Sequence, residues 1–340
     1  MKIRTKDKII LRTIFGIVLL LALLVLSLSC KKPEKFTGPR EKVTIGVASV
    51  ILSVPIFIAY EKGFFSDEGL DVTMEYYPSG KKAMEGMFAG EVELSTVADT
   101  PIVFNSFIRE DFVVFATFVY SYNDVKVICR KDKGVNSPAD LKGKKIGISL
   151  KTTAHFFNYI YLFEHRIDKS EVKIIDIPPE DLPGALQQGK VDAIVIFEPY
   201  AYRAQKALPD KAARLPKSQF YRETFNLTAM KRFAHEHPEL LKKFLKAVDR
   251  AIEFIKQNKK ESIALMAQRT NAEEDFLVSV WDDFVYELSL DYSLLATLED
   301  EARWAIKNKL THRTEVPNYL GFIYMDGLKV VKPGAATIIK

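Results

Sequence analysis

The chain has 340 residues, of which 48% are hydrophobic and 27% are charged, and its formal net charge is +5. This composition excludes a disordered or fibrous protein and is sufficient for two globular lobes. Residues 1–29 contain five Lys or Arg residues and one Asp, so the remainder carries a net charge of only +1. The body therefore lacks the basic surplus that is typical of nucleic-acid-binding proteins.

Residues 1–30 have the pattern of an export signal. Basic residues precede an apolar run, and Ser27-Leu28-Ser29-Cys30 resembles a bacterial lipobox, in which Cys30 receives the lipid. The commonest lipobox has Leu at the position of Ser27, and the apolar run is nearly long enough to be an uncleaved membrane anchor instead. Both alternatives predict a body in the periplasm or at the cell surface, tethered through a flexible linker over residues 31–42.

The body begins with strands and helices in alternation. The pattern predicts a strand over residues 43–47, a helix that starts near Pro55 and ends at Gly63, and a second strand over residues 70–74. A helix over residues 81–89 follows, and Gly90 leads from it into a third strand. This order predicts parallel pairing of neighbouring strands.

Several segments resemble one family of solute-binding proteins. The stretch IAYEKGFFSDEGLDV over residues 58–72, SPADLKGKKIGI over 137–148 and TTAH over 152–155 are similar to the nitrate, sulfonate, taurine and thiamine-precursor group of periplasmic binding proteins. These proteins are the solute receptors of ABC importers. The resemblance covers nearly the whole body and implies an α/β fold of type II. In that fold two lobes, each a mixed and mostly parallel sheet flanked by helices, are hinged at two crossovers.

Two interruptions predict where the lobes meet. The apolar strand pattern over residues 112–119 breaks over residues 120–124, and a short strand is expected over residues 225–229. The first lobe is then discontinuous, over residues 43–122 and 224–340, and the second lobe covers residues 123–223. Helices are expected over residues 271–288 and 295–308, where they pack back on the first lobe.

The best candidate site is the turn after the strand Ile146-Gly147-Ile148. Thr152 and Thr153 stand where a helix begins, and the free N–H groups of a helix start attract anions. The resemblance assigns ligand contact to this turn, whereas structural capping is the alternative. His155, one turn further on, is either a donor to the ligand or a histidine satisfied by the backbone.

Further candidates follow other strands. Ser49 and Leu52 lie on the loop after the first strand, where parallel sheets bind ligands. Asp99 and Glu198 end two similarly built helix–Gly–strand segments, and each either receives a ligand amino or hydroxyl group or caps a helix. Tyr120 and Tyr200 are the aromatic candidates for contact with a planar ligand, whereas the alternative is that they belong to the core, as aromatic residues near strands usually do.

The resemblance predicts a binding protein and not an enzyme. A Gly-x-Ser-x-Gly motif, a phosphate-binding glycine loop and zinc-ligand spacings are missing from the sequence, so we expect no catalytic residue, metal or cofactor. The expected function is delivery of a small organic anion, such as a sulfonate, nitrate or carboxylate, to an ABC permease of the inner membrane by a monomeric lipoprotein. The alternatives are a planar heterocycle, such as a thiamine-pyrimidine precursor or a flavin, as the ligand, or a sensory role without transport.

Overall fold

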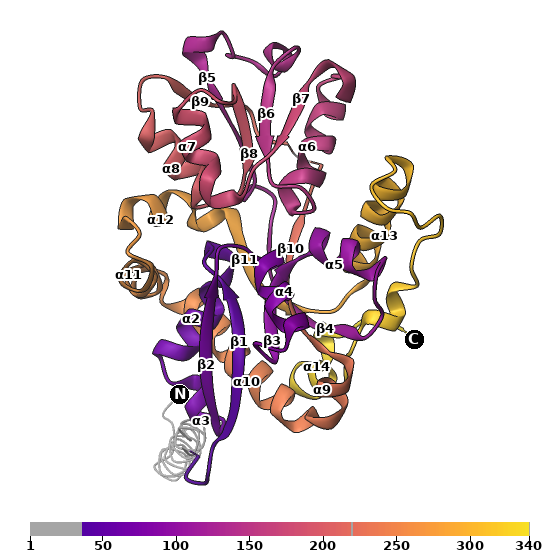
Figure 1. Cartoon of the computed structure of the whole chain (residues 1–340). Coiled ribbons are helices and arrows are strands. Elements are labelled where there is room, and N and C mark those ends of the chain that lie inside the picture. Colours follow the sequence, from indigo (N-terminus) through magenta and orange to yellow (C-terminus); the bar gives the residue numbers. More distant parts are fainter. Residues whose placement is uncertain (1–35, 219, 340) are drawn as a thin grey trace, which may run out of the picture. The chain divides into compact units, whose positions relative to one another are not determined.

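Two mixed sheets organise the chain in the computed structural model, which describes residues 36–218 and 220–339 (Figure 1). Residues 38–340 form one compact unit that holds both sheets. The predicted signal over residues 1–30, with Cys30, and most of the predicted linker lie outside the described residues.

The first sheet has six strands in the order β11-β4-β10-β3-β1-β2. β1 is parallel to β2 and β3, whereas β10 is antiparallel to β3 and β4. Every residue of β3 is buried, because helices cover both faces, whereas alternate residues of β2 are exposed. The strands are β1 (Glu41–Ala48), β2 (Leu70–Tyr77), β3 (Leu94–Ala98), β4 (Phe112–Ser121), β10 (Glu223–Met230) and β11 (Phe284–Ser289).

The second sheet has five strands in the order β7-β6-β8-β5-β9. β6 pairs in parallel with β7 and β8, and β5 is antiparallel to β8 and β9. Both sheets hold more antiparallel pairs than the mostly parallel expectation, because β5 and β10 enter their sheets from the crossovers in the reverse direction. The strands are β5 (Lys126–Arg130), β6 (Lys145–Ile148), β7 (Lys173–Asp176), β8 (Ala193–Ile196) and β9 (Ala212–Arg214).

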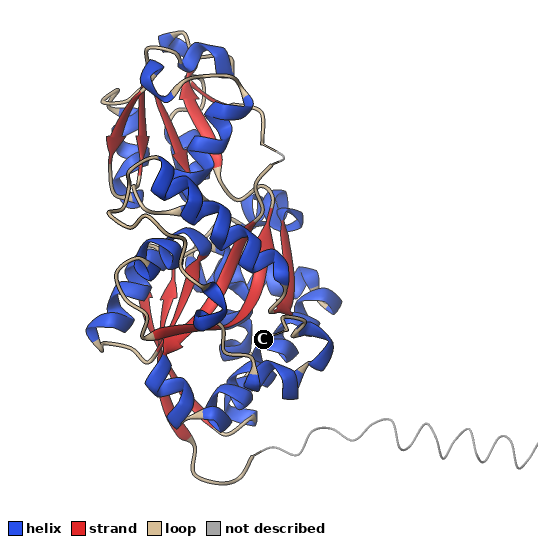
Figure 2. Ribbon diagram, turned by 90° about the vertical axis from the view of Figure 1, so that its right-hand side faces the viewer, coloured by secondary structure: helices blue, strands red, loops and turns tan. Residues whose placement is uncertain are grey.

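Helices flank each sheet (Figure 2). We call the six-stranded sheet and its helices the first lobe, and the five-stranded sheet and its helices the second lobe. The second lobe contains α6 (Thr153–Glu164), α7 (Leu182–Gln187) and α8 (Tyr200–Ala207). The helices of the first lobe are α2 (Val54–Glu61), α3 (Phe64–Asp67), α4 (Gly80–Ala89), α5 (Asp99–Ser106), α9 (Lys231–Glu236), α10 (Pro238–Gln257), α11 (Lys259–Thr270), α12 (Glu274–Val280), α13 (Tyr292–Lys307) and α14 (Asp326–Val331).

The longest of these helices, α10, closes the core of the first lobe. Leu241, Phe244, Leu245 and Val248 recur at helical spacing and are all fully buried. This apolar face packs against α2, α3 and α14. The C-terminal helix α10 therefore packs on the lobe that the N-terminal strands began.

One predicted helix is wrong in its second half. Residues 271–288 were expected to be a single helix, but α12 ends at Val280 and residues 284–289 form the edge strand β11. The reason is a change of period: Phe284, Tyr286 and Leu288 are buried, whereas Val285 and Glu287 between them are exposed. Alternation over six residues is a strand signal, although a short one.

Two connections join the lobes, one between β4 and β5 and the other between β9 and β10. The two-lobe α/β fold predicted from the sequence is thus confirmed. Among the helices that the structure describes, none combines the length and the apolar character needed to cross a bilayer.

Candidate functional site

Three helices begin at one cavity between the lobes. α4 and α5 come from the first lobe and α6 from the second, and each follows the carboxyl end of a strand. Such positions are where open α/β sheets bind ligands. We call this space the interlobe cavity; it measures about 20 Å³ and is lined by Val50, Leu52, Ser79, Gly80, Lys81, Ala98, Pro101, Thr152, Thr153, Phe197, Glu223 and Phe225.

The start of α4 is held against the first sheet by close packing. A Cβ atom at Gly80 would lie only 2.8 Å from the Cα of Val97, so a residue with a side chain cannot approach β3 as closely. Ser79 caps the helix by accepting a hydrogen bond from the Lys82 N–H over 3.4 Å. The first turn of α4 is therefore fixed at the cavity wall.

The start of α6 has a different arrangement. The Thr152 hydroxyl donates to the carbonyl oxygen of Ser149 over 2.7 Å, and α6 has no side-chain cap hydrogen bond. Thr153 is buried beside it, and its hydroxyl faces the carboxyl of Glu223. The uncapped first turn leaves backbone donors that an anion can use.

Lys81 connects the two walls. Its side chain lines the interlobe cavity, and its Nζ donates a hydrogen bond to the carbonyl oxygen of Leu150 over 3.2 Å. Leu150 belongs to the loop between β6 and α6, so this bond joins the first lobe to the second. A lysine ammonium beside three helix N-termini makes this wall electropositive.

A carboxyl group also faces the cavity. Glu223 is buried, and its Oε2 atom has no hydrogen-bond partner among the described residues. Burial raises the pKa of Glu223 well above its usual value, and the neighbouring Asp124 and Asp99 carboxylates raise it further. The raised pKa favours the protonated form of Glu223, which can donate a hydrogen bond.

Asp99 is fully buried, but its oxygens already have partners. Oδ1 accepts from the Tyr221 hydroxyl over 2.6 Å and from the Thr100 N–H over 2.9 Å, and Oδ2 accepts from the Thr224 N–H over 2.8 Å. The side chain does not line the interlobe cavity. These bonds tie the start of α5 to β10 and to the segment that precedes it.

Neighbouring residues of the segment after β8 point to different surroundings. Phe197 lines the interlobe cavity, whereas Glu198 Oε2 accepts from the Tyr202 N–H over 2.9 Å and so binds the first turn of α8. Burial raises the pKa of Glu198. Tyr200 donates to the carbonyl oxygen of Pro78 over 3.0 Å, which gives a second bond between the lobes.

Two candidates lie away from the interlobe cavity. His155 packs in an aromatic cluster, stacked on Phe104 at 6.4 Å and edge-on to Trp304 at 4.9 Å between ring centroids. Its Nδ1 accepts from the Lys151 N–H, and burial lowers its pKa to about 4. The ring of Tyr120 is covered by the Arg222 guanidinium at 3.8 Å.

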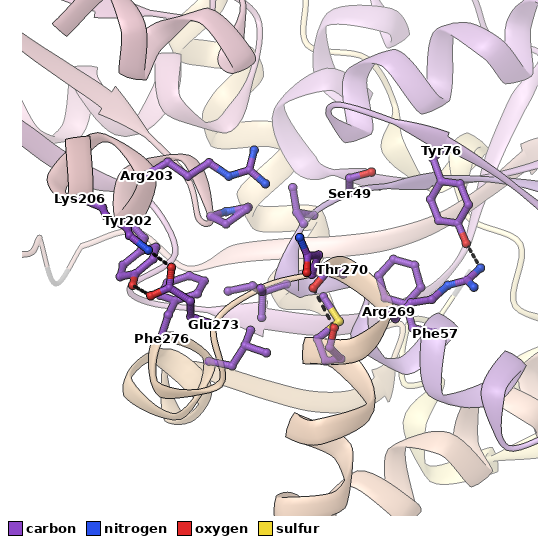
Figure 3. Close-up of a pocket in the computed structure, with 17 residues that line it drawn as sticks. Ser49, Phe57, Tyr76, Tyr202, Arg203, Lys206, Arg269, Thr270, Glu273 and Phe276 are labelled. Carbon is purple, nitrogen blue, oxygen red and sulfur yellow. Dashed lines mark hydrogen bonds and ion pairs between the residues drawn. The ribbon is translucent and has the colours of Figure 1, made fainter. Parts of the chain in front are cut away.

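Ser49 lines a second and larger space next to the interlobe cavity (Figure 3). We call it the side pocket; it has a volume of about 480 Å³.

The structure thus brings Leu52, Thr152 and Thr153 together in the interlobe cavity and puts Ser49 in the neighbouring pocket. Sequence reasoning missed Ser79, Gly80, Lys81 and Glu223. A Ser-Gly-Lys sequence between a predicted strand and a predicted helix was the available signal for the first three.

Within the described residues, no cluster of His, Cys, Asp and Glu side chains is suited to hold a metal ion.

The family model described as NMT1/THI5 like matches residues 52–262. A protein of Bacillus subtilis (strain 168) that is named for the binding of aliphatic sulfonates is 25% identical over 257 residues, which cover 74% of this chain and 76% of the relative. The taurine-binding periplasmic protein of Escherichia coli (strain K12) is 22% identical over 61% of this chain and 65% of its own length.

A solved structure supports the fold. The alkanesulfonate-binding protein SsuA from Xanthomonas axonopodis pv. citri, bound to MOPS, aligns with a TM-score of 0.74 at 15% identity and covers 85% of this chain and 100% of SsuA. These relatives are named as binding proteins, in agreement with the prediction that the chain is not an enzyme. The family model spans more than half of the chain, and its match confirms the resemblance drawn from the sequence. The protein therefore belongs to the NMT1/THI5-like family.

Proposed function

We propose that this protein binds a small organic anion of the sulfonate type between its lobes and delivers it to the permease of an ABC importer. Leu52, Lys81, Thr152 and Thr153 contact the anion in this proposal. The single observation that carries it is the convergence of three helix N-termini and Lys81 on the interlobe cavity. The names of the relatives, which refer to sulfonates and taurine, point to the same ligand class.

The physical basis is the match between a compact anion and the backbone donors at the starts of α4 and α6. At the start of α5 the Thr100 N–H already bonds Asp99 and Pro101 has no N–H, so that helix contributes its dipole alone. Each helix start carries a partial positive charge of about half an elementary charge, and its first N–H groups point out of the helix. Thr153 adds a hydroxyl, and Lys81 adds a full positive charge. A tetrahedral sulfonate presents three acceptor oxygens, so donors from different helices can bind it at the same time.

Glu223 is compatible with this ligand because its pKa is raised. A charged carboxylate would repel an anion, whereas the protonated group can donate to one sulfonate oxygen. Binding of the anion would in turn hold the proton on Glu223. The raised pKa therefore reduces the electrostatic cost of placing a carboxyl group at an anion site.

Transport requires a tether and a partner. We propose that Cys30 is lipidated and holds the monomeric protein at the outer surface of the cytoplasmic membrane, where the ligand-bound form meets the permease. Replacing Cys30 by Ser should release the protein in soluble form if a second signal peptidase accepts the leader. Labelling with a radioactive fatty acid should mark the parent protein and not the Cys30→Ser variant, and a parent protein without label would contradict lipidation.

The test of the ligand class is a binding panel. Protein refolded without ligand is heated with ethanesulfonate, taurine, nitrate, acetate and a neutral aminopyrimidine. We expect one or more of the anions to raise the melting temperature, with the sulfonates strongest, and titration calorimetry to give one site per chain. Stabilisation by the pyrimidine alone would contradict the anion proposal and support the heterocycle alternative.

A further inference from the structure

The side pocket is built by both lobes and has the size of a small-molecule site. Its volume of about 480 Å³ falls within the usual range for ligand pockets, roughly 300–1,000 Å³. α8 of the second lobe forms one wall, and α11, α12 and the loop after β1 form the others (Figure 3). An occupant would therefore contact both lobes.

Two stacked aromatic pairs give the side pocket flat apolar walls. The rings of Phe57 and Tyr76 stack at 6.3 Å and 15°, and those of Tyr202 and Phe276 stack at 4.2 Å and 21°. Met266 and Leu277 contribute further apolar surface. Such surfaces favour an aromatic or other bulky apolar group over a short alkyl chain.

The side pocket also has an excess of positive charge. Lys206 pairs with Glu273, and Arg269 pairs with Glu61 at 3.4 Å. Arg203 makes no ion pair within the described residues, and its guanidinium lies over the ring of Tyr200 at 5.3 Å. Figure 3 shows this guanidinium extending from α8 away from the Lys206–Glu273 pair. Arg203 is thus placed to receive an acceptor group.

The side pocket adjoins the interlobe cavity. Val50 lines both spaces. Leu52 and Phe197 line the interlobe cavity, and their near neighbours in the chain, Ser49 and Pro199, line the side pocket. The interlobe cavity, at about 20 Å³, has room for about one water molecule, which needs roughly 10–15 Å³ on the same measure. A sulfonate group is larger than one water molecule, so its binding requires the cavity to widen, and the body of a larger ligand needs a second space.

We propose that the side pocket receives the body of the ligand, so that the preferred ligand is an aryl or similarly bulky sulfonate and not a compact one. The sulfonate is held at the helix N-termini, the ring lies between the stacked aromatic pairs, and a further acceptor group on the ring faces Arg203. This inference rests on the proposed function, because it takes the head group as an anion bound in the interlobe cavity.

The experiment measures affinities of the full-length protein in detergent for ethanesulfonate, benzenesulfonate, naphthalenesulfonate and sulfobenzoate. Burial of a ring should strengthen binding at least ~10-fold from ethanesulfonate to naphthalenesulfonate. Ala272→Trp, which fills the side pocket, should abolish this gain and leave ethanesulfonate binding unchanged. Ala264→Trp is the matched control, because Ala264 is exposed on α11 and does not line the pocket.

A second variant tests the acceptor group. Arg203→Met should weaken sulfobenzoate at least ~10-fold and change naphthalenesulfonate little, because only the former carries a second anionic group. Equal affinity for all four sulfonates in every variant would overturn the side-pocket inference while leaving the proposed function in place. Failure of all four to bind the unaltered protein would overturn both.

Discussion

The Nζ of Lys81 donates a hydrogen bond to the carbonyl oxygen of Leu150 over 3.2 Å and so links the first turn of α4 to the loop that precedes α6. Lys81 is also one of the residues that line the interlobe cavity. One side chain thus contributes both to the contact between the lobes and to the charge of the candidate anion site. Its removal should affect ligand affinity more than it affects folding.

The first prediction concerns Lys81→Met. Loss of a charge-assisted hydrogen bond to an anion costs about 1.5–3 kcal/mol, so we expect sulfonate affinity to fall by about 10- to 150-fold. The free energy of unfolding without ligand should change by less than about 1 kcal/mol, because the side chain is only half-buried. Lys82→Met is the control: Lys82 is exposed and pairs with Glu85 at 2.7 Å on the same helix. Similar affinity losses in both variants would argue against a site at Lys81.

The second prediction separates the two threonines at α6. Thr152→Ala removes a buried hydroxyl that donates to the Ser149 carbonyl oxygen, so it should lower the free energy of unfolding by about 1–2 kcal/mol. Thr153→Ala should instead weaken anion binding with little change in ligand-free melting, because its hydroxyl faces Glu223 at the cavity. Calorimetry and thermal melting of both variants provide the comparison. A Thr153 variant that melts as early as the Thr152 variant would make both residues structural.

The third prediction treats Asp99 as a structural tie. Asp99→Ala leaves the Tyr221 hydroxyl and the Thr224 N–H without their buried acceptor, and we expect it to destabilise the protein by about 3 kcal/mol in urea unfolding. Tyr221→Phe removes one of these bonds and should cost about 1 kcal/mol. If Asp99→Ala folds with normal stability but loses ligand, the residue belongs to the binding site.

The fourth prediction is a pH dependence of stability at the crossover between β4 and β5. Burial raises the pKa of Asp124 from 3.8 to about 7, with a further contribution from Glu198 that Lys126 opposes. Between these pKa values the native state keeps a proton that the unfolded chain has lost. The contribution of Asp124 to the free energy of unfolding is therefore fully present below pH 3.8 and is lost as the pH rises toward 7.

Asp124→Asn replaces the titrating carboxyl by a neutral amide, so no charge is buried above pH 7. The variant should therefore be more stable than the parent protein above pH 7, by about 1–3 kcal/mol, with a much smaller difference near pH 4. His155 acts in the opposite direction: its pKa is lowered from 6.5 to about 4, so its contribution is lost as the pH falls below 6.5. Comparing urea unfolding of the variant and the parent at each pH cancels the His155 effect. Asp210→Asn, at an exposed position, is the control, and a pH-independent difference for Asp124→Asn would contradict the prediction.

Local order in the sequence was enough to select some of the residues that line the interlobe cavity. Thr152 and Thr153 follow a buried strand and start a helix, and Leu52 lies on a strand-to-helix loop, so the rule for parallel sheets was sufficient to place them. Asp99 was also a candidate from the sequence, but its hydrogen-bond partners Tyr221 and Thr224 are more than a hundred residues away in the chain. Local patterns do not reveal such partners.

Contacts between the lobes escaped prediction for the same reason. Lys81 becomes part of the site because α6 of the second lobe lies opposite it, and Glu223 because β10 returns to the first sheet. The side pocket combines α8 with α11 and α12, whose helical pattern carries no sign of what they face. β11 was missed because only six residues alternate after a helix that shares its apolar composition.

The position of β10 has a consequence for the order in which the chain can fold. β4 pairs only with β10 and β11 in the first sheet, and both are made after the whole second sheet is complete at Arg214. When the chain becomes available from its N-terminus, the five-stranded sheet can therefore assemble while β4 still has no partner and β3 has an open edge. Unpaired strand edges invite association between chains. Folding from the N-terminus should thus pass through an aggregation-prone stage until β10 is available, and a chaperone that covers strand edges would protect the chain most at that point.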